Sequence, residues 1–274
     1  MKLRIFLFTL LLNIFSIADN ADVKEVCSVQ FSFTSEKKLV PGEELNYVVS
    51  YSFINLGEVR IRVKDKKTVN GKNHYNAVAY IDSYDGIPFV NLHQIYESKV
   101  NDNYYSDFFR GIVKGDEYTT YTEYYFNYDE SQIRIKRGKF SPKEIWVDST
   151  TSADKQFQDG LSIFFFARML SGKKKSIYVP CFVNERKEKT KVNFYDESIP
   201  VSIGSIDYDV DCVRLDGEMD FISIFGLTGY FEGWFTNDEA SIPIVAHMKV
   251  IIGNIKLELK SWKREGWTPP KYKN

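Results

Sequence analysis

The sequence predicts an all-β protein: an antiparallel β-barrel or curved half-barrel with one buried helix. About fourteen short runs alternate apolar and polar residues between turn residues, a spacing typical of sandwiches and barrels. Aromatic residues make up 16% of the chain, with 18 Tyr and 21 Phe, and they favour half-buried strand faces. One stretch, residues 157–172, has helical periodicity instead.

The N-terminus has the pattern of a secretory signal peptide, residues 1–18. Lys2 and Arg4 form its charged part, and a short apolar run follows. Small residues at the end of this run predict cleavage after Ala18. A retained membrane anchor is the alternative, but the run is shorter than the ~20 residues that a bilayer requires. The mature chain is therefore expected outside the cytoplasm, without a transmembrane span.

The formal net charge of the chain is only -1. This value gives no bulk attraction for nucleic acid or for an anionic membrane. We therefore expect no nucleic-acid partner. The high aromatic content instead indicates a lipid or a glycan as the kind of molecule that the protein binds.

Three cysteines remain to be explained. Lys24 and Glu25 precede Cys27, whereas a lipid-attachment site needs a small residue there, so lipidation is not expected. Cys181 and Cys212 lie in strand-like runs with another expected strand between them. We expect unbridged cysteines that pack as small hydrophobic residues; a bridge between the last two is the alternative.

The first half of the chain reads as a series of antiparallel strands. Residues 19–39 are expected to be partly loose, around a first strand at 28–34. Turns are expected at 41–42, at 55–57 and at Asn70-Gly71, a strong hairpin signal. The further strands are expected at 45–53, 59–64, 75–81, 89–100, 104–109, 117–128 and 132–138, with a short one at Trp146 and a polar stretch at 148–155.

The helix follows this polar stretch. Asp159 is the expected N-cap, and Gly172 lies just past the end, where a left-handed residue closes a helix. Its apolar stripe is formed at helical spacing by Leu161, Phe164, Phe165 and Met169. Further apolar residues cover most of the circumference, which is typical of a buried helix. We expect it to plug the barrel, with Phe164 and Phe165 pointing inward.

The second half is again rich in strands. They are expected at 177–183, 192–195, 206–215, 230–235, 244–252 and 254–260, with turns or bulges at 216–217 and 226–229. No linker rich in Pro, Gly or Ser separates the two halves. Residues 19–274 are therefore expected to form a single domain.

Several short motifs occur together in a fixed order: 41–47 followed by 56–58, 158–162 with 167–168, and 233–238 through 242–243. With these motifs the chain resembles the family named domain of unknown function 3108, exported proteins of Gram-negative bacteria, over about residues 40–262. The resemblance implies a barrel-like fold and a location in the periplasm or outer envelope, but no reaction or ligand. Gly160 departs from the pattern, since a better helix former is expected there. The motif residues are Gly42, Glu43, Gln158, Asp159, Arg168, Trp234, Asp238 and Pro243.

The sequence offers no catalytic pair, no cofactor motif and no metal site. His74, His93 and His247 lie in expected strands without further ligands at metal-binding spacing. No nucleophile elbow, Walker loop, dinucleotide fingerprint or zincin motif occurs. An enzyme is therefore the least favoured class of function.

Gln158, Asp159 and Arg168 form the most notable polar group. Arg168 lies on the apolar stripe of the helix, where an unpaired buried charge is costly, so it needs a partner. Asp238 is the expected partner. Such a pair would lock the helix to the barrel; alternatively, the guanidinium would form a pocket floor that binds a carboxylate or phosphate.

Residues 118–128 contain an unusual density of aromatic side chains, among them Tyr124 and Tyr128. They indicate either barrel packing or a ligand-binding surface, because curved sheets with aromatic walls form such sites. We expect a non-enzymatic envelope protein that binds an apolar or amphipathic ligand or contacts other envelope components. The alternative is a glycan-binding module with an exposed aromatic face.

Overall fold

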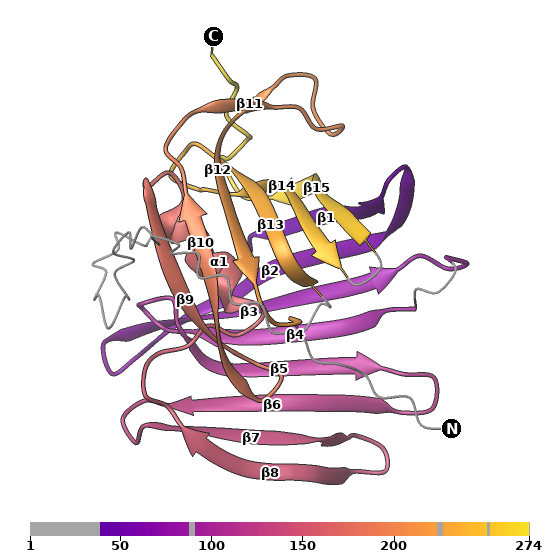
Figure 1. Cartoon of the computed structure of the whole chain (residues 1–274), viewed down its shortest axis with the longest axis vertical. Helices are drawn as coiled ribbons and strands as arrows, with labels where there is room; N and C mark the ends of the chain where they lie inside the picture. Colours follow the sequence, from indigo (N-terminus) through magenta and orange to yellow (C-terminus); the bar gives the residue numbers. More distant parts are fainter. Residues whose placement is uncertain (1–38, 88–90, 224–226, 251–252, 274) are drawn as a thin grey trace, which may run out of the picture.

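The computed structural model describes residues 39–87, 91–223, 227–250 and 253–273. They form one antiparallel sheet of 15 strands and one short helix, α1 (Ser162–Leu170), as the sequence predicts (Figure 1). The signal peptide, Cys27 and the strand expected at 28–34 lie outside the described residues. The strands are β1 (Glu44–Tyr51), β2 (Ile54–Val69), β3 (Lys72–Ser83), β4 (His93–Val100), β5 (Ser106–Lys114), β6 (Thr119–Asn127), β7 (Gln132–Lys139), β8 (Glu144–Ser152), β9 (Lys175–Val183), β10 (Arg186–Phe194), β11 (Ile199–Val201), β12 (Val210–Met219), β13 (Leu227–Thr236), β14 (Pro243–Val250) and β15 (Gly253–Lys263).

The sheet has two wings that meet where the first and last strands pair. The strand order is β8-β7-β6-β5-β4-β3-β2-β1-β15-β14-β13-β12-β10-β9, and β11 pairs with β12 outside this path. Strands that follow one another in the chain are mostly neighbours, so short turns connect them. The sheet curves around α1 but is not closed, which makes the fold a half-barrel (Figure 1).

The two edge strands, β8 and β9, are tied together by the segment that leads from β8 into α1. The Gln158 amide donates to the Pro180 carbonyl over 2.9 Å, and the Phe182 amide donates to the Gln158 carbonyl over 2.8 Å. Lys187 at the start of β10 also reaches Asp154, with 3.0 Å between Nζ and Oδ1. This segment therefore occupies the gap that a closed barrel would fill with strand pairing.

Three local predictions were wrong. The first hairpin turns at Ser52 and Phe53 instead of 55–57, and Gly57 lies within β2. Gly217 is in the middle of β12, where a Cβ would lie 2.3 Å from the Lys191 carbonyl oxygen, so close packing explains the glycine. The polar stretch at 148–155 largely belongs to β8, whose position at the sheet edge leaves its side chains exposed.

The helix lies inside the curve of the sheet. Phe165, Met169 and Leu170 are buried in the larger of two hydrophobic clusters, which also contains residues of both wings. The helix starts later than expected, because Leu161 is its N-cap and Asp159 precedes it by two residues. Gly172 has a φ of 74°, the expected left-handed conformation just beyond the C-cap.

Cys181 in β9 and Cys212 in β12 are both buried and free, as expected. The intervening β10 separates their strands. Within the described parts of the chain, no helix has both the length and the apolar character needed to cross a membrane.

Candidate functional site

Two apolar cavities lie side by side between α1 and the concave face of the sheet. The first has a volume of about 120 Å³ and the second about 130 Å³. They share the side chain of Phe164 on α1 and four residues of β14, namely Pro243, Val245, Ala246 and Met248. Phe164 therefore forms a partition between two halves of one apolar groove.

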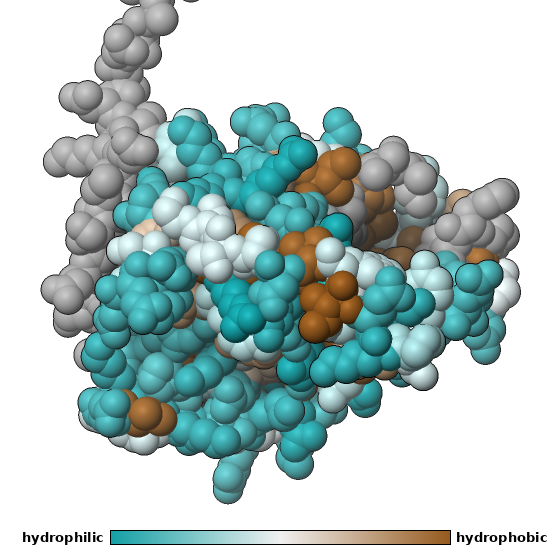
Figure 2. All heavy atoms as spheres, turned by 90° about the horizontal axis from the view of Figure 1, so that it is seen from below, coloured by the Kyte–Doolittle hydropathy of each residue, from teal (hydrophilic) through white to brown (hydrophobic). Residues whose placement is uncertain are grey.

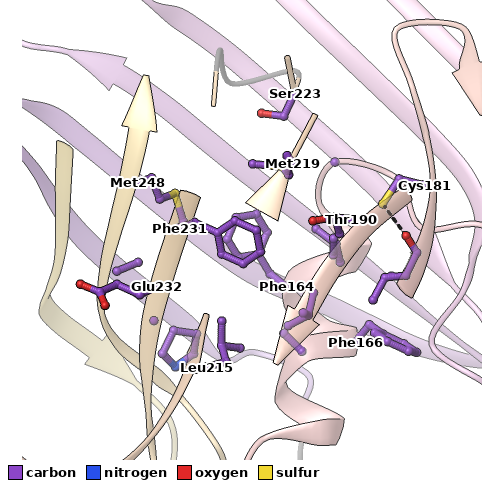
Figure 3. A pocket seen from close by; sticks show the side chains of 18 of the residues that line it. Phe164, Phe166, Cys181, Thr190, Leu215, Met219, Ser223, Phe231, Glu232 and Met248 are labelled. Carbon is purple, nitrogen blue, oxygen red and sulfur yellow. Dashed lines mark hydrogen bonds between the residues drawn. The ribbon is translucent and has the colours of Figure 1, made fainter. Parts of the chain in front are cut away.

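The first cavity extends from α1 towards β9, β10, β12 and β13. Phe231 and Met248 lie close to Phe164 in its middle, while Thr190 and Cys181 line the far side (Figure 3). Nearly all of the exposed atoms in its wall are apolar. Burial raises the pKa of the Cys181 thiol, with a further contribution from the Asp159 carboxylate, so this sulfur is a thiol and not a nucleophilic thiolate at neutral pH.

The second cavity extends the other way, towards β1, β2, β3 and β15. Its walls include Val49, Val59 and Ile81, and it reaches Leu92, which is 41% exposed. Tyr47 contributes a polar atom at one end, but its hydroxyl donates to the Pro243 carbonyl over 3.0 Å. Burial raises the pKa of the Tyr47 phenol, which therefore stays protonated.

The open space follows from a row of residues that face the groove across neighbouring strands. In this row Leu215 of β12 pairs with Gly233 of β13, Gly233 with Ala246 of β14, and Ala246 with Leu257 of β15. The two small residues in the middle leave the volume that larger side chains would fill. A Cβ at Gly233 would lie 3.2 Å from the Phe235 ring, so even an alanine there would crowd this ring.

Arg168 is fully buried and paired, as the sequence predicts. Its carboxylate partner is Glu43, however, so the prediction that Asp238 is the partner was wrong. Its guanidinium donates to both carboxylate oxygens of Glu43, over 2.6 and 3.1 Å, and to the Ala240 carbonyl over 3.0 Å. Arg264 also pairs with Glu43. Burial opposes the charge of Arg168, but the Glu43 carboxylate outweighs this effect and raises the pKa of the guanidinium.

Asp238 organises the turn between β13 and β14 instead. Its carboxylate accepts hydrogen bonds from the Thr236 hydroxyl, the Ala240 and Ser241 amides and the Trp267 indole nitrogen. Neither Arg168 nor Asp238 lines either cavity. The ion pair of Arg168 thus locks the helix to the segment before β1.

Asp159 is buried beside the first cavity, at the start of the helix. Its carboxylate accepts from the Leu161 and Ser162 amides, each over 2.7 Å. The hydroxyls of Ser98 and Ser106 donate to its other oxygen over 2.6 and 2.5 Å. Burial raises the pKa of this carboxyl despite these four donors. The neighbouring Gln158 is buried too. Its side-chain oxygen accepts from the Ser162 hydroxyl, and its side-chain nitrogen has no hydrogen-bond partner among the described residues.

Tyr124 and Tyr128 belong to the interior. Tyr124 is 2% exposed and its hydroxyl accepts from the Glu185 amide over 3.2 Å. Burial raises the pKa of Tyr124 to about 12. The Tyr128 hydroxyl donates to the Ser106 carbonyl and accepts from the Phe157 amide. Both rings therefore pack the half-barrel, and Tyr124 is inaccessible to a sugar stacked on the outer face.

The three histidines each contact one carboxylate: His74 with Asp107, His93 with Asp82 and His247 with Glu232. No group of three or more His, Cys, Asp or Glu side chains arranged to hold a metal ion occurs among the described residues.

The walls of the groove offer apolar contacts and few polar groups. Several residues that line it were singled out from the sequence, but only as helix, cysteine or motif residues: Phe164, Leu161, Asp159, Cys181 and Pro243. Gly233 and Pro243 belong to the family motifs, and an isolated glycine in a strand signals close approach or missing side-chain volume. Ala246 and Met248 carried no signal that distinguishes them from ordinary strand residues.

The fold resembles several solved structures at low sequence identity. A β-barrel-like protein of the DUF1849 family from Brucella abortus shares 13% identity, covering 82% of this chain and 98% of that one, with a TM-score of 0.45. A Bacteroides fragilis protein with a YmcC-like fold shares 8% identity over 82% of this chain and 97% of that one, with a TM-score of 0.33. A hypothetical protein of Chlamydia trachomatis shares 8% over 86% and 93%, with a TM-score of 0.33.

No curated protein matches the chain. The family model described as "Protein of unknown function (DUF3108)" matches residues 46–260. The match covers most of the chain, so this protein belongs to the DUF3108 family.

Proposed function

We propose that this protein binds a molecule with a hydrocarbon chain in the groove beside α1 and acts as a carrier or receptor, not as an enzyme. The observation that carries this proposal is the pair of apolar cavities that share Phe164 and one stretch of β14. A chain that passes Phe164 contacts both cavities, because this side chain is the partition between them.

Energetics support an occupant. An apolar cavity in a protein core costs stability, because the side chains around it lose contacts on one side. Each methylene group that moves from water into such a site contributes about 0.8 kcal/mol. Binding in the micromolar range corresponds to about 8 kcal/mol, so it requires about ten such methylene groups before the ordering costs of the ligand are counted.

The test is a fluorescence titration with 1-anilinonaphthalene-8-sulfonate, followed by displacement with dodecanoic acid. We expect displacement by the wild type and at least tenfold weaker binding of dodecanoic acid by Ala246→Phe, since Ala246 lines both cavities. The matched control is His247→Phe. It introduces the same ring at the next position of β14, where the side chain points away from the groove and contacts Trp234.

Equal binding by the two variants would show that the ligand lies elsewhere. Because Ala246→Phe adds a large ring to the interior, Ala246→Leu serves as a milder version, and a melting curve establishes that each variant is folded. Binding of a polysaccharide without any binding of dodecanoic acid would instead favour a glycan-binding protein.

We also propose that the protein is exported to the periplasm or outer envelope and is cleaved after Ala18. The support is the charged and apolar pattern of residues 1–18. Cell fractionation followed by N-terminal sequencing tests this proposal. We expect a chain that begins at Asp19 in the envelope fraction; an uncleaved chain in the cytoplasm would contradict it.

A further inference from the structure

We propose that one edge of the half-barrel docks on the surface of a lipid bilayer. This edge consists of the turns β1–β2, β5–β6 and β7–β8 and the described residues 84–87 and 91–92 of the β3–β4 connection, with the adjoining strand ends. It is called here the strand-end rim. The inference rests on the proposed function, because it gives the ligand of the groove a source. In an antiparallel meander, alternate turns lie at the same end of the sheet, so the topology places these four side by side.

The part of the rim nearest the groove exposes large apolar side chains. The β1–β2 hairpin turns at Ser52, which has a φ of 53°, and presents Phe53 with 90% of its surface exposed. Ile54 is 45% exposed beside it. Tyr84 and Leu92 are exposed on the β3–β4 connection. A phenylalanine as open to solvent as Phe53 has no packing role in the chain itself.

The rest of the rim continues this pattern along the sheet. Val113 and Tyr118 flank the β5–β6 turn, and Phe140, Ile145 and Trp146 flank the β7–β8 turn. Tyr51 completes the set on the β1–β2 hairpin. Among the described residues, fourteen large apolar side chains are exposed, and ten of them lie on this rim.

The opposite end of the same strands differs. Val69 and Tyr125 are the two exposed large apolar residues at the described turns β2–β3, β4–β5 and β6–β7 and their adjoining strand ends. Seen from below, the apolar side chains gather mainly on the right-hand half of the molecule (Figure 2). This is the side on which the β3–β4, β5–β6 and β7–β8 turns lie (Figure 1). The asymmetry therefore belongs to one end of the sheet and is not a general feature of its surface.

The arrangement fits a lipid surface better than a protein partner. A protein interface needs one contiguous, shape-complementary patch. The rim instead presents side chains from four separate turns, spread over eight strands and so over roughly 30 Å. Two of its aromatic residues, Trp146 and Tyr118, carry a polar atom on an apolar ring, and the Trp146 indole nitrogen donates to Glu144 over 2.9 Å. Rings of this kind, apolar with one polar atom, favour the headgroup region of a bilayer.

The rim is continuous with the groove. Leu92 belongs to both, since it is exposed and also lines the second cavity. The walls of that cavity reach the rim through Val49, two residues before Tyr51, and Ile81, three residues before Tyr84. Docking through the rim would place this end of the groove against the acyl chains, and a ligand could then pass between bilayer and protein without crossing water.

The test is co-sedimentation of the chain from Asp19 onward with phosphatidylcholine vesicles, which carry no net charge. We expect binding by the wild type and at least a tenfold lower partition coefficient for Phe53→Ser combined with Trp146→Ser. The matched control is Val69→Ser, an exposed apolar residue at the opposite end, which should bind like the wild type. Phe53 is 90% exposed, whereas Trp146 also contacts the Tyr118 ring, so a melting curve establishes that each variant is folded.

Three outcomes would overturn the docking proposal. The first is that the wild type fails to sediment with vesicles. The second is that the double variant sediments like the wild type. The third is that the wild type forms a concentration-dependent dimer and the double variant does not. Dodecanoic acid binding in solution keeps the two proposals apart. We expect the double variant to bind dodecanoic acid as the wild type does, because neither substituted residue lines a cavity. Loss of vesicle binding alone would then support the role of the rim. Failure of the wild type to bind dodecanoic acid would instead contradict the proposed function of the groove.

Discussion

At the scale of single residues, the most costly group in the protein is the Arg168 guanidinium. It is fully buried, and two of its partners come from distant parts of the sequence: Glu43 from before β1 and the Ala240 carbonyl from the β13–β14 turn. The contact ties the helix to both ends of the chain. Such a pair adds little net stability but imposes a large penalty when one partner is removed.

We therefore expect Glu43→Gln to lower the free energy of unfolding by about 3 kcal/mol or more, because it leaves two arginines facing a neutral amide. Urea unfolding measures the effect. Asp148→Asn is the control, since Asp148 pairs with Arg134 on the surface and solvent screens this pair. An equal shift of the urea midpoint in both variants would contradict the special role of the buried pair.

Asp159 predicts a distinct pH dependence. Burial raises the pKa of its carboxyl in the folded state above the value of about 3.9 in an unfolded chain. At pH values between these two pKa values, Asp159 carries more bound protons in the folded state than in the unfolded state. Its contribution to stability is therefore fully present below about pH 4 and is lost as the pH rises through the folded-state pKa. Asp159→Asn keeps an oxygen for the Leu161 and Ser162 amides but cannot titrate.

The relevant quantity is the unfolding free energy of the wild type minus that of Asp159→Asn, measured in urea at several pH values. This difference should fall as the pH rises above 4. A difference that rises with pH would mean that the four hydrogen bonds to the carboxylate outweigh the cost of its burial.

At the scale of elements, local periodicity predicted most strands, and long-range packing decided what it missed. The Asn70-Gly71 hairpin forms as expected, because both residues adopt positive φ without the help of other parts of the chain. Asp216-Gly217 predicts a turn or bulge, but Gly217 lies inside β12. The Phe231 ring of the neighbouring strand packs directly against it, and this contact explains why the residue is a glycine. A glycine needed for such an approach cannot be told from a turn glycine without knowing the neighbour.

The candidate site illustrates the same limit. Arg168 clearly needed a partner, yet Glu43 is 125 positions away and no spacing rule connects them. The groove was harder still to foresee, because it depends on Gly233 and Ala246 meeting across β13 and β14. A cavity is a property of neighbouring strands together, and single-strand patterns do not encode it.

The connection between β8 and α1 allows a prediction at this scale. β9 is an edge strand, but its Phe182 amide donates to the Gln158 carbonyl. In a strand, alternate amides point to the same side, so the Tyr178 amide faces the same edge, beyond this connection. Hydrogen exchange should therefore be slow at Phe182 and fast at Tyr178. Equally fast exchange at both would show that the two edges are not tied together in solution.

At the scale of the whole molecule, the two wings of the sheet share one core. The larger hydrophobic cluster contains Val63 and Tyr75 from the first wing, Val192 and Leu215 from the second, and Phe165 from the helix between them. β1 and β15 also join the wings by antiparallel pairing from Glu44↔Lys263 to Ser50↔Lys256, with one bulge between Asn46 and Tyr47. Neither wing can bury its concave face without the helix, and the helix contacts both.

This shared core predicts that the protein unfolds as one cooperative unit. Native-state hydrogen exchange in low concentrations of urea tests it, with the amides of Ile135 in β7 and Val213 in β12 as reporters for the two wings. Both residues are buried on interior strands, so their slowest exchange requires unfolding of the surrounding sheet. We expect opening free energies that agree to within about 1 kcal/mol and converge as urea is added. A difference of several kcal/mol, with separate urea dependences, would mean that the wings are independent units and that the groove between them can open while each wing stays folded.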